Sequence, residues 1–282
     1  MKQEANEIRP GQSIELLKEL HILTRDGRMN QDSRRKLKQV YHLCQFIQPL
    51  LEEVRAEHPD VQLVDHGAGK SYLGFILYDL YFKEWSGGAH IVGVEARNEL
   101  VDKSRELARR LGFPGMSFLN LSVAESTKAI EAEGLPERTD IVTALHACDT
   151  ATDDAIRFAL ERDARFIVLA PCCQAEVAAV LKKNKRPADG PLTELWRHPL
   201  HTREFGSQVT NVLRCLELEA HGYQVTVTEL VGWEHSMKNE LIIARKKAGA
   251  NPRAARRLTE MLAALGLQEL EQRFNLQPGK PA

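Results

Sequence analysis

The residues best suited to bind a ligand lie in a glycine turn, Leu63-Val-Asp-His-Gly-Ala-Gly-Lys-Ser-Tyr-Leu73. An apolar run that predicts a strand ends at Asp65, and Gly67 and Gly69 then lead the chain into a predicted helix. Glycine allows this sharp bend, and its missing Cβ lets a ligand approach the backbone. Glu95 ends the next predicted strand, 26–28 residues after the two glycines, and its carboxylate can accept hydrogen bonds from two neighbouring hydroxyls. The pattern indicates a site for a nucleoside-containing cofactor.

Three kinds of cofactor compete for this turn. A phosphate-binding loop ending in Gly69-Lys-Ser71 needs a glycine five residues before Gly69, where Val64 stands, and is excluded. A dinucleotide fingerprint needs a third glycine where Tyr72 stands, which weakens the case for an NAD-dependent oxidoreductase. S-adenosylmethionine (SAM) needs glycines beside its amino-acid part and an acid beside its ribose, and both are present. The joint pattern favours SAM, with a glycine turn that serves packing alone as the plain alternative.

Residues after the third and fourth predicted strands complete the expected cofactor pocket, because the carboxyl ends of parallel strands meet at one edge of a sheet. Asn120, Ser122 and Val123 follow the third strand and are expected to flank the adenine. Asn120 and Ser122 are equally suited to ordinary turn roles. His146 and Asp149 follow the fourth strand and should face the methyl group.

Methyl transfer from a sulfonium is an in-line displacement, so alignment supplies much of the rate. An oxygen or nitrogen acceptor also needs a proton removed. His146, with a pKa near neutrality, is the candidate general base, and Asp149 is its orienting partner or a second base. The alternative is that His146 only hydrogen-bonds SAM and that Asp149 caps the helix that follows it.

Two further groups of residues are candidates for contact with a substrate. Cys172 and Cys173 end the fifth predicted strand and are expected either to line the substrate pocket or to be buried as small apolar side chains. Their spacing is not diagnostic of a metal site, and no metal is expected. The aromatic and basic segment that follows contains Trp196, Arg197, His201 and Arg203.

The aromatic and basic segment has a composition that can stack on and neutralise single-stranded RNA. A solvated loop followed by an anchored helix explains the same residues equally well. RNA is therefore a predicted partner, and the sequence leaves the oligomeric state open.

The elements that should position these candidate residues are short apolar strands, which alternate with amphipathic helices from residue 61 onward. Such alternation predicts an α/β fold with a parallel sheet, since parallel strands need a crossover. Two final strands, at 224–230 and 240–244, are separated by about nine residues and should pair antiparallel. We therefore expect a Rossmann-like, seven-stranded class I methyltransferase sheet, with five parallel strands and an antiparallel terminal hairpin.

The chain is expected to divide into three parts. Residues 1–58 predict a helical N-terminal cap in which Pro49 should kink or break the helix. Residues 59–247 form the methyltransferase domain, with an insertion at about 174–202, and residues 248–282 form a C-terminal helical tail.

Composition limits the class of protein further. The 282 residues carry 38 basic and 39 acidic side chains, which excludes a polybasic nucleic-acid coat. No apolar run reaches the roughly 18 residues that span a bilayer, so no membrane partner is expected. Five scattered cysteines argue against a secreted disulfide framework and indicate a cytoplasmic protein.

Four motifs together resemble a broad methyltransferase-domain family, across about residues 36–245: Asp65-His-Gly-Ala-Gly-Lys-Ser-Tyr-Leu, Gly93-Val-Glu-Ala-Arg97, Leu145-His-Ala-Cys-Asp149 and Pro171-Cys-Cys173. The family includes the glutathione-S-transferase C-terminal-domain-containing protein and, more distantly, tRNA 2′-O-methyltransferases with a Cys-Cys-His-His signature. The resemblance implies SAM-dependent methyl transfer.

The resemblance specifies the acceptor less well than the cofactor. RNA is the favoured acceptor by family analogy, but Gln174 follows the two cysteines where the tRNA enzymes continue with histidines. This departure puts a tRNA 2′-hydroxyl target in doubt. A protein or small-molecule methyltransferase, and a SAM- or RNA-binding module without catalysis, are the alternatives.

Overall fold

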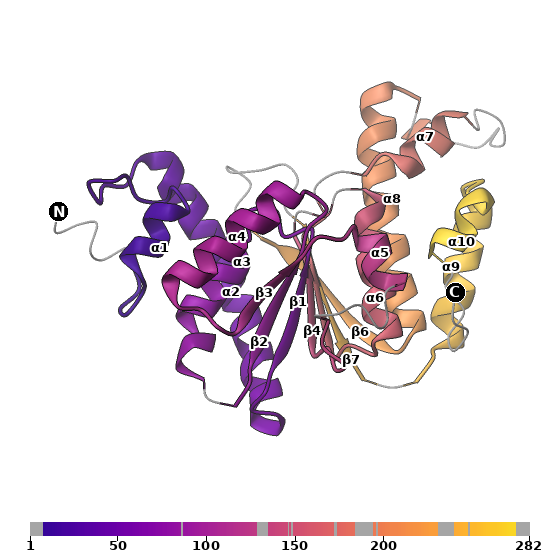
Figure 1. Ribbon diagram of the computed structural model, residues 1–282. Helices are drawn as coiled ribbons and strands as arrows, with labels where there is room; N and C mark the ends of the chain where they lie inside the picture. Colours follow the sequence, from indigo (N-terminus) through magenta and orange to yellow (C-terminus); the bar gives the residue numbers. More distant parts are fainter. Residues whose placement is uncertain are drawn as a thin grey trace.

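Seven strands form one sheet in the order β3-β2-β1-β4-β5-β7-β6 (Figure 1). The computed structural model describes residues 8–85, 87–128, 135–145, 147, 149–171, 174–183, 194–195, 197–230, 240–247 and 249–274. The strands are β1 Gln62–His66, β2 His90–Val94, β3 Met116–Leu119, β4 Ile141–Ala144, β5 Phe166–Leu169, β6 Tyr223–Glu229 and β7 Glu240–Lys246.

Strands β1 to β5 pair in parallel, and β7 pairs antiparallel with both β5 and β6. This register confirms the predicted sheet of five parallel strands closed by an antiparallel hairpin. Every residue of β4 and β5 is buried, as expected of parallel strands covered by helices on both faces. Within the described residues, no helix is both long enough and apolar enough to cross a membrane.

Helices cover the two faces of the sheet (Figure 1). The helices on one face are α1 Ile14–Glu19, α2 Gln31–Glu57, α3 Tyr72–Leu80 and α4 Asn98–Leu111, with the short 3₁₀ turn Phe82–Glu84 after α3. On the other face lie α5 Val123–Lys128, α6 Thr150–Glu161 and α8 Pro199–Ala220. Helices α7 Glu176–Lys183, α9 Pro252–Ala264 and α10 Glu271–Phe274 pack against α8, with a 3₁₀ turn at Gln268–Leu270.

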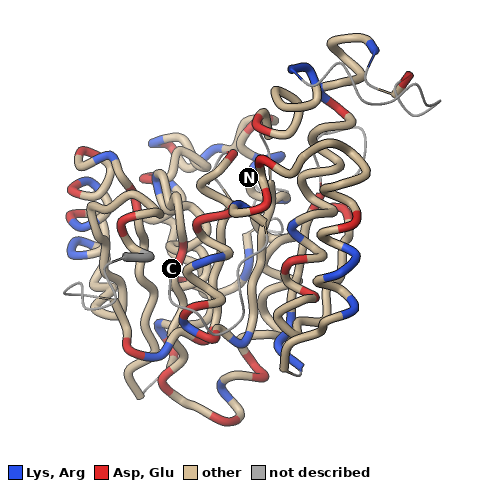
Figure 2. The backbone as a smooth tube through the Cα atoms, turned by 90° about the vertical axis from the view of Figure 1, so that its right-hand side faces the viewer, with Lys and Arg blue, Asp and Glu red and all other residues tan. Residues whose placement is uncertain are grey.

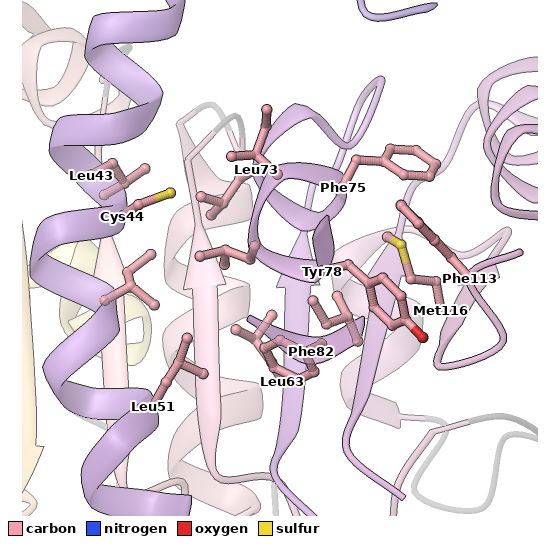
Figure 3. Packing of buried hydrophobic residues seen from close by; sticks show 14 of the residues in the cluster. Leu43, Cys44, Leu51, Leu63, Leu73, Phe75, Tyr78, Phe82, Phe113 and Met116 are labelled. Carbon is pink, nitrogen blue, oxygen red and sulfur yellow. The ribbon is translucent and has the colours of Figure 1, made fainter. Parts of the chain in front are cut away.

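The larger core lies between the sheet and the N-terminal helices. In Figure 3, Leu43, Cys44 and Leu51 of α2 point toward side chains of α3 and β1. On the far side of α3, Tyr78 packs on Phe113 with ring centroids 4.6 Å apart. The predicted N-terminal cap therefore shares one continuous core with the sheet.

The sequence predicted a kink or a break at Pro49, and the break does not occur. Helix α2 runs without interruption from Gln31 to Glu57. Proline in a helix interior removes one backbone hydrogen bond and costs about 3 kcal/mol. Ile47, Leu51 and Val54 flank the proline and are completely buried. Each buried side chain of this size contributes about 1.5–3 kcal/mol, so packing of the stripe outweighs the loss.

The region predicted as an insertion, at about 174–202, contains α7 and the first turn of α8. In Figure 1, α7 and the first half of α8 rise above the edge of the sheet where the parallel strands end. Helix α8 starts at Pro199, and proline fits the first turn of a helix. The two helices approach closely at Gly206, where a Cβ would lie 2.7 Å from the Ala178 Cβ.

Candidate functional site

The glycine turn between β1 and α3 has the backbone conformation that its sequence requires. Gly67 and Gly69 have φ values of +63° and +59°, in the region that only glycine enters without strain. Ser71, the residue before α3, also has a positive φ of 52°. A Cβ on Gly69 would meet only the end of the Arg97 side chain, at 3.8 Å, and the Gly67 carbonyl. The turn therefore leaves its backbone open to a ligand.

Glu95 lies directly beside this turn. The Gly69 N–H donates to Oε2 of Glu95 at 2.8 Å. Arg97 donates to Oε1 through its backbone N–H at 3.0 Å and Nε at 2.8 Å, and to Oε2 through Nη2 at 3.3 Å. A carboxylate has about four acceptor positions, so these four donors fill them.

The charge state of Glu95 follows from those contacts. Burial alone would raise the pKa of Glu95, but hydrogen bonds from Arg97 and from the Gly69 backbone lower it below its usual value. Glu95 is therefore an ionised carboxylate that is able to accept hydroxyl donors in place of the Arg97 side chain, which is 64% exposed.

Asp65 stands in a different environment from Glu95. It is buried at the end of β1 and receives one hydrogen bond, from the Thr143 hydroxyl of β4 to Oδ1 at 2.6 Å. Burial raises the pKa of Asp65 to about 7, although the Thr143 hydrogen bond opposes this rise. A carboxyl group with this pKa gains or loses its proton near neutral pH.

His66, which follows Asp65, received no role from the sequence. Its ring is wholly buried and contacts Phe158 of α6 edge to face, with centroids 4.6 Å apart. Burial lowers the pKa of His66 to about 3, so the imidazole is neutral at physiological pH. We interpret His66 as part of the core beneath the glycine turn.

The residues expected beside the adenine have separate structural roles. Asn120 lies at the predicted edge, where its Nδ2 donates to the carbonyls of Glu95 at 3.1 Å and Ala96 at 2.8 Å. Ser122 and Glu125 form a reciprocal cap at the start of α5. Val123 is buried in the core of the α5–α6 face. Among these residues, Asn120 joins the loops after β2 and β3, whereas Ser122 has the turn role given as its alternative.

Asp149 precedes α6, but its side chain makes no cap hydrogen bond to that helix. Its Oδ1 instead accepts the Ala175 N–H at 3.1 Å, which ties the segment after β4 to the segment after β5. Its backbone has φ 52° and ψ −122°, a conformation disfavoured for residues with a Cβ. The alternative that Asp149 only caps the helix therefore does not describe this geometry.

Several predicted site residues, namely His146, Cys172, Cys173 and Trp196, lie outside the described residues. Arg197, His201 and Arg203 are described and exposed, Arg197 just before α8 and the other two on its first turns. Arg197 pairs with Glu194 at 3.1 Å and Arg203 with Glu204 at 2.9 Å, while the His201 ring contacts that of His198. Figure 2 likewise shows basic and acidic residues interspersed. Across the described ranges, no three His, Cys, Asp or Glu side chains are grouped to hold a metal.

Three residues near the site were not singled out from the sequence: Arg97, Thr143 and Arg214. Arg214 offered a signal, because it is a charged residue on the apolar face of α8, where it is completely buried. Thr143 is an ordinary strand residue, and only the pairing of β1 with β4 brings it to Asp65.

A protein-family model described as a methyltransferase domain matches residues 35–180, more than half of the chain. The chain belongs to this methyltransferase family. SAM is accordingly its cofactor, and the glycine turn and the acid after β2 fit that ligand. The fit rests on the open backbone of Gly69 and on the ionised Glu95 bonded to it.

Individual proteins are similar to this methyltransferase at low identity. A glutathione S-transferase C-terminal domain-containing protein of Bos taurus is 22% identical over 247 residues, which is 79% of this chain and 35% of the relative. The chain thus spans about a third of that relative's length. Magnesium protoporphyrin IX methyltransferase from Synechocystis, solved with bound SAH, has 16% identity and a TM-score of 0.48, covering 83% of this chain and 95% of that one. A putative caffeoyl-CoA O-methyltransferase from Staphylococcus aureus has 10% identity and a TM-score of 0.43, covering 87% and 96%.

The protonation of Asp65 predicts a pH-dependent stability. The pKa of Asp65 in the folded protein, about 7, lies above its value of about 3.9 in an unfolded chain. The contribution of Asp65 to the free energy of unfolding is therefore complete below about pH 3.9 and is lost as the pH rises to about 7. Each pH unit between the two values is worth about 1.4 kcal/mol. We expect the free energy of unfolding of the wild type, relative to Asp65→Asn, to fall by a few kcal/mol between pH 4 and 7 in urea titrations.

Thr143→Val is the matched variant, because it removes the hydroxyl that lowers the pKa of Asp65 while keeping the shape of the side chain. It should extend the loss of stability to higher pH. A constant difference between the wild type and Asp65→Asn from pH 4 to 7 would contradict a neutral carboxyl group at this position.

Proposed function

We propose that this chain transfers a methyl group from SAM to an acceptor bound where the parallel strands end, and that RNA is the acceptor. The observation that carries the proposal is the 2.8 Å hydrogen bond between the Gly69 N–H and Glu95, which joins the open turn after β1 to the acid after β2. When bound, SAM supplies the electrophilic methyl group. The protein residues bind and orient the two reactants.

The cofactor side of the proposed site consists of residues around the glycine turn. Gly67 and Gly69 offer an open backbone to the amino-acid part, beside the buried Asp65. Glu95 accepts hydrogen bonds from the ribose hydroxyls. For the adenine we propose Asn120, Ser122 and Val123, which follow β3, with Asn120 bonded to the loop that contains Glu95.

The acceptor side of the proposed site is the segment after β4. Asp149 is bonded through Oδ1 to the segment after β5, so its carboxylate bridges the two segments that flank the expected methyl position. A carboxylate there is able to orient an acceptor or to accept its proton. His146 remains the predicted general base and an additional cofactor contact, and Cys172 and Cys173 remain predicted pocket residues.

RNA is favoured by the exposed side chains at the start of α8. His201 and Arg203 stand on the first turns of α8, which rises above the carboxyl ends of the strands (Figure 1), and Arg197 lies two residues before the helix begins. Each arginine has an acidic neighbour, but exposed pairs are worth about 0–1 kcal/mol and phosphate can replace the acid. Trp196 stays a predicted stacking residue, and the cytoplasmic location stays a prediction.

Glu95→Ala should weaken the binding of S-adenosylhomocysteine by about tenfold or more. A hydrogen bond to a charged group contributes about 1.5–3 kcal/mol, and the variant removes the acceptor of both ribose hydroxyls. Calorimetric titration measures the affinity, with NAD and ATP as ligand controls. Glu99→Ala, an exposed acid in the first turn of α4, is the matched variant and should bind as the wild type does. Equal affinities for the two variants would disprove the ribose assignment.

Arg97→Ala should have the opposite effect on the same ligand. The ribose hydroxyls must replace the two side-chain donors of Arg97 because the Glu95 carboxylate is saturated. An exposed pair is worth up to about 1 kcal/mol, so affinity should rise by up to about fivefold. Weaker binding of S-adenosylhomocysteine by this variant would mean that Arg97 itself contacts the cofactor.

Transfer of labelled methyl groups tests the acceptor. The protein is incubated with labelled SAM and with RNA, protein and small-molecule fractions of a cell extract. We expect the labelled methyl groups to appear in the RNA fraction, and treatment of that fraction with ribonuclease should release the label. Label elsewhere would assign a protein or small-molecule acceptor, and binding of S-adenosylhomocysteine without any transfer would indicate a non-catalytic module.

The salt dependence of RNA binding adds a site-specific test. Arg197→Ala with Arg203→Ala should reduce the slope of log affinity against log salt by about two, because each lost phosphate contact reduces it by about one. The double variant Arg253→Ala with Arg256→Ala removes the same charge from the exposed face of α9 and should leave the slope unchanged.

A further inference from the structure

We propose that Arg214 of α8 is a positioning residue for methyl transfer, which holds the Asp149 turn at the acceptor side of the site. This inference rests on the proposed function. Arg214 lies outside the glycine turn and far along the chain from Asp149. It is completely buried, and a buried guanidinium is tolerated only where hydrogen bonds and a counter-charge compensate it.

The contacts of Arg214 divide between a counter-charge and a backbone carbonyl. Nε and Nη2 bind the two carboxylate oxygens of Asp153, at 2.6 and 3.0 Å. Nη2 also donates to the Asp149 carbonyl at 2.8 Å, and Nη1 donates to Oδ1 of Asn211 at 3.3 Å. The ion pair with Asp153 of α6 is sufficient to compensate the charge of Arg214. The additional hydrogen bond to the Asp149 carbonyl holds the backbone of the turn before α6.

The backbone that Arg214 holds is strained. Asp149 has φ 52° and ψ −122°, which glycine adopts far more readily than aspartate. Three hydrogen bonds maintain it: Arg214 and the Thr152 N–H, at 3.2 Å, both donate to the carbonyl, and the Ala175 N–H donates to the side chain. A strained backbone persists only where its surroundings over-determine it, and such residues cluster at functional sites.

The network continues from Arg214 to the neighbouring segments. Oδ1 of Asn211 accepts a hydrogen bond from Nε2 of Gln174 at 2.9 Å. Nδ2 of Asn211 donates a hydrogen bond to Oε2 of Glu240 at 2.6 Å. Ser207 donates its hydroxyl to Oε1 of Gln174 at 2.8 Å. Side chains on successive turns of α8 therefore connect the segment after β4, the segment after β5 and the first residue of β7. One helix sets the relative positions of these three parts of the acceptor side.

Arg165 provides an internal comparison. It also links separate elements, since it binds Glu53 and Glu57 of α2, but it precedes β5 and thus lies at the opposite edge of the sheet. The Arg165 side chain is 29% exposed. Within the described residues, its guanidinium donates hydrogen bonds only to the carboxylates of other side chains. Loss of its fork geometry should leave the acceptor side unchanged.

The test compares Arg214→Lys with Arg165→Lys in the full chain. Lysine keeps the charge beside Asp153, but its single nitrogen does not reproduce the planar fork that also reaches Asp149. We expect Arg214→Lys to lower kcat by about 10- to 100-fold, because a misplacement of about 1 Å costs rates of this order. KM for SAM and the affinity for S-adenosylhomocysteine should stay within about twofold, since the glycine turn is untouched. Arg165→Lys should match the wild type in all three measurements.

Amide hydrogen exchange gives a readout that does not depend on activity. The Ala175 and Thr152 amides should lose protection in Arg214→Lys and keep it in Arg165→Lys. If the wild type transfers no methyl group, the proposed function fails, while exchange still decides whether Arg214 holds the turn. Wild-type kcat, or wild-type protection of these amides in Arg214→Lys, would overturn the positioning role.

A second variant covers the case in which Arg214→Lys does not fold. Arg214→Met combined with Asp153→Leu removes both charges, so no unpaired charge is buried, and such exchanges are often neutral for stability. This variant should melt near the wild-type temperature yet show the same loss of kcat and of amide protection. A folded double variant with wild-type kcat would equally overturn the proposal.

Discussion

The parallel pairing of β1 with β2 and β4 is the constraint on which the site depends. Parallel strands run in one direction, so the segments that follow them all emerge at one edge of the sheet. The pairing of β1 with β4 sets Asp65 opposite Thr143, and the pairing of β1 with β2 brings the turn after β1 to the acid after β2. Residues 26 or 78 positions apart thus exchange hydrogen bonds that no local structure could form.

The pKa values of two carboxyl groups at this edge shift in opposite directions because the two groups receive different numbers of hydrogen-bond donors. Asp65 receives one hydroxyl, which does not offset its burial, and its pKa rises to about 7. Glu95 is also buried, but donors from Arg97 and Gly69 overcome the desolvation and its pKa falls below the usual value. A charged acid suits hydroxyl groups, whereas an acid that titrates near neutrality responds to a charged ligand placed beside it. One edge of the sheet therefore presents two chemically distinct acids.

Local sequence patterns predicted the fold well, since the alternation of strands and helices is a short-range signal. Apolar runs predicted the two final strands to within about two residues, and spacing singled out Gly67, Gly69 and Glu95 as candidate cofactor residues. Of the kink or break predicted at Pro49, the break does not occur, because tertiary packing of α2, which a local rule does not include, outweighs the lost hydrogen bond. The positive φ of Asp149 and its bond to Ala175 were also beyond prediction, because residues on other elements impose them. Arg214 and Asp153 are 61 positions apart, and only the assembled fold joins them.

The proposed cofactor side and the proposed acceptor side differ in how much of each lies within the region matched by the family model. The matched region, residues 35–180, includes the glycine turn, Glu95 and Asp149 but ends within α7. Asn211, Arg214 and Glu240 lie beyond it, on α8 and β7, yet they determine the surroundings of Asp149 and Gln174. The proposed cofactor turn thus lies inside the matched region, whereas part of the hydrogen-bond network that supports the proposed acceptor side lies outside it. Among the hydrogen bonds of the described residues, Arg214 and Asn211 bind the proposed acceptor side and not the glycine turn, so substitutions at these two positions should disturb the acceptor side before the cofactor turn.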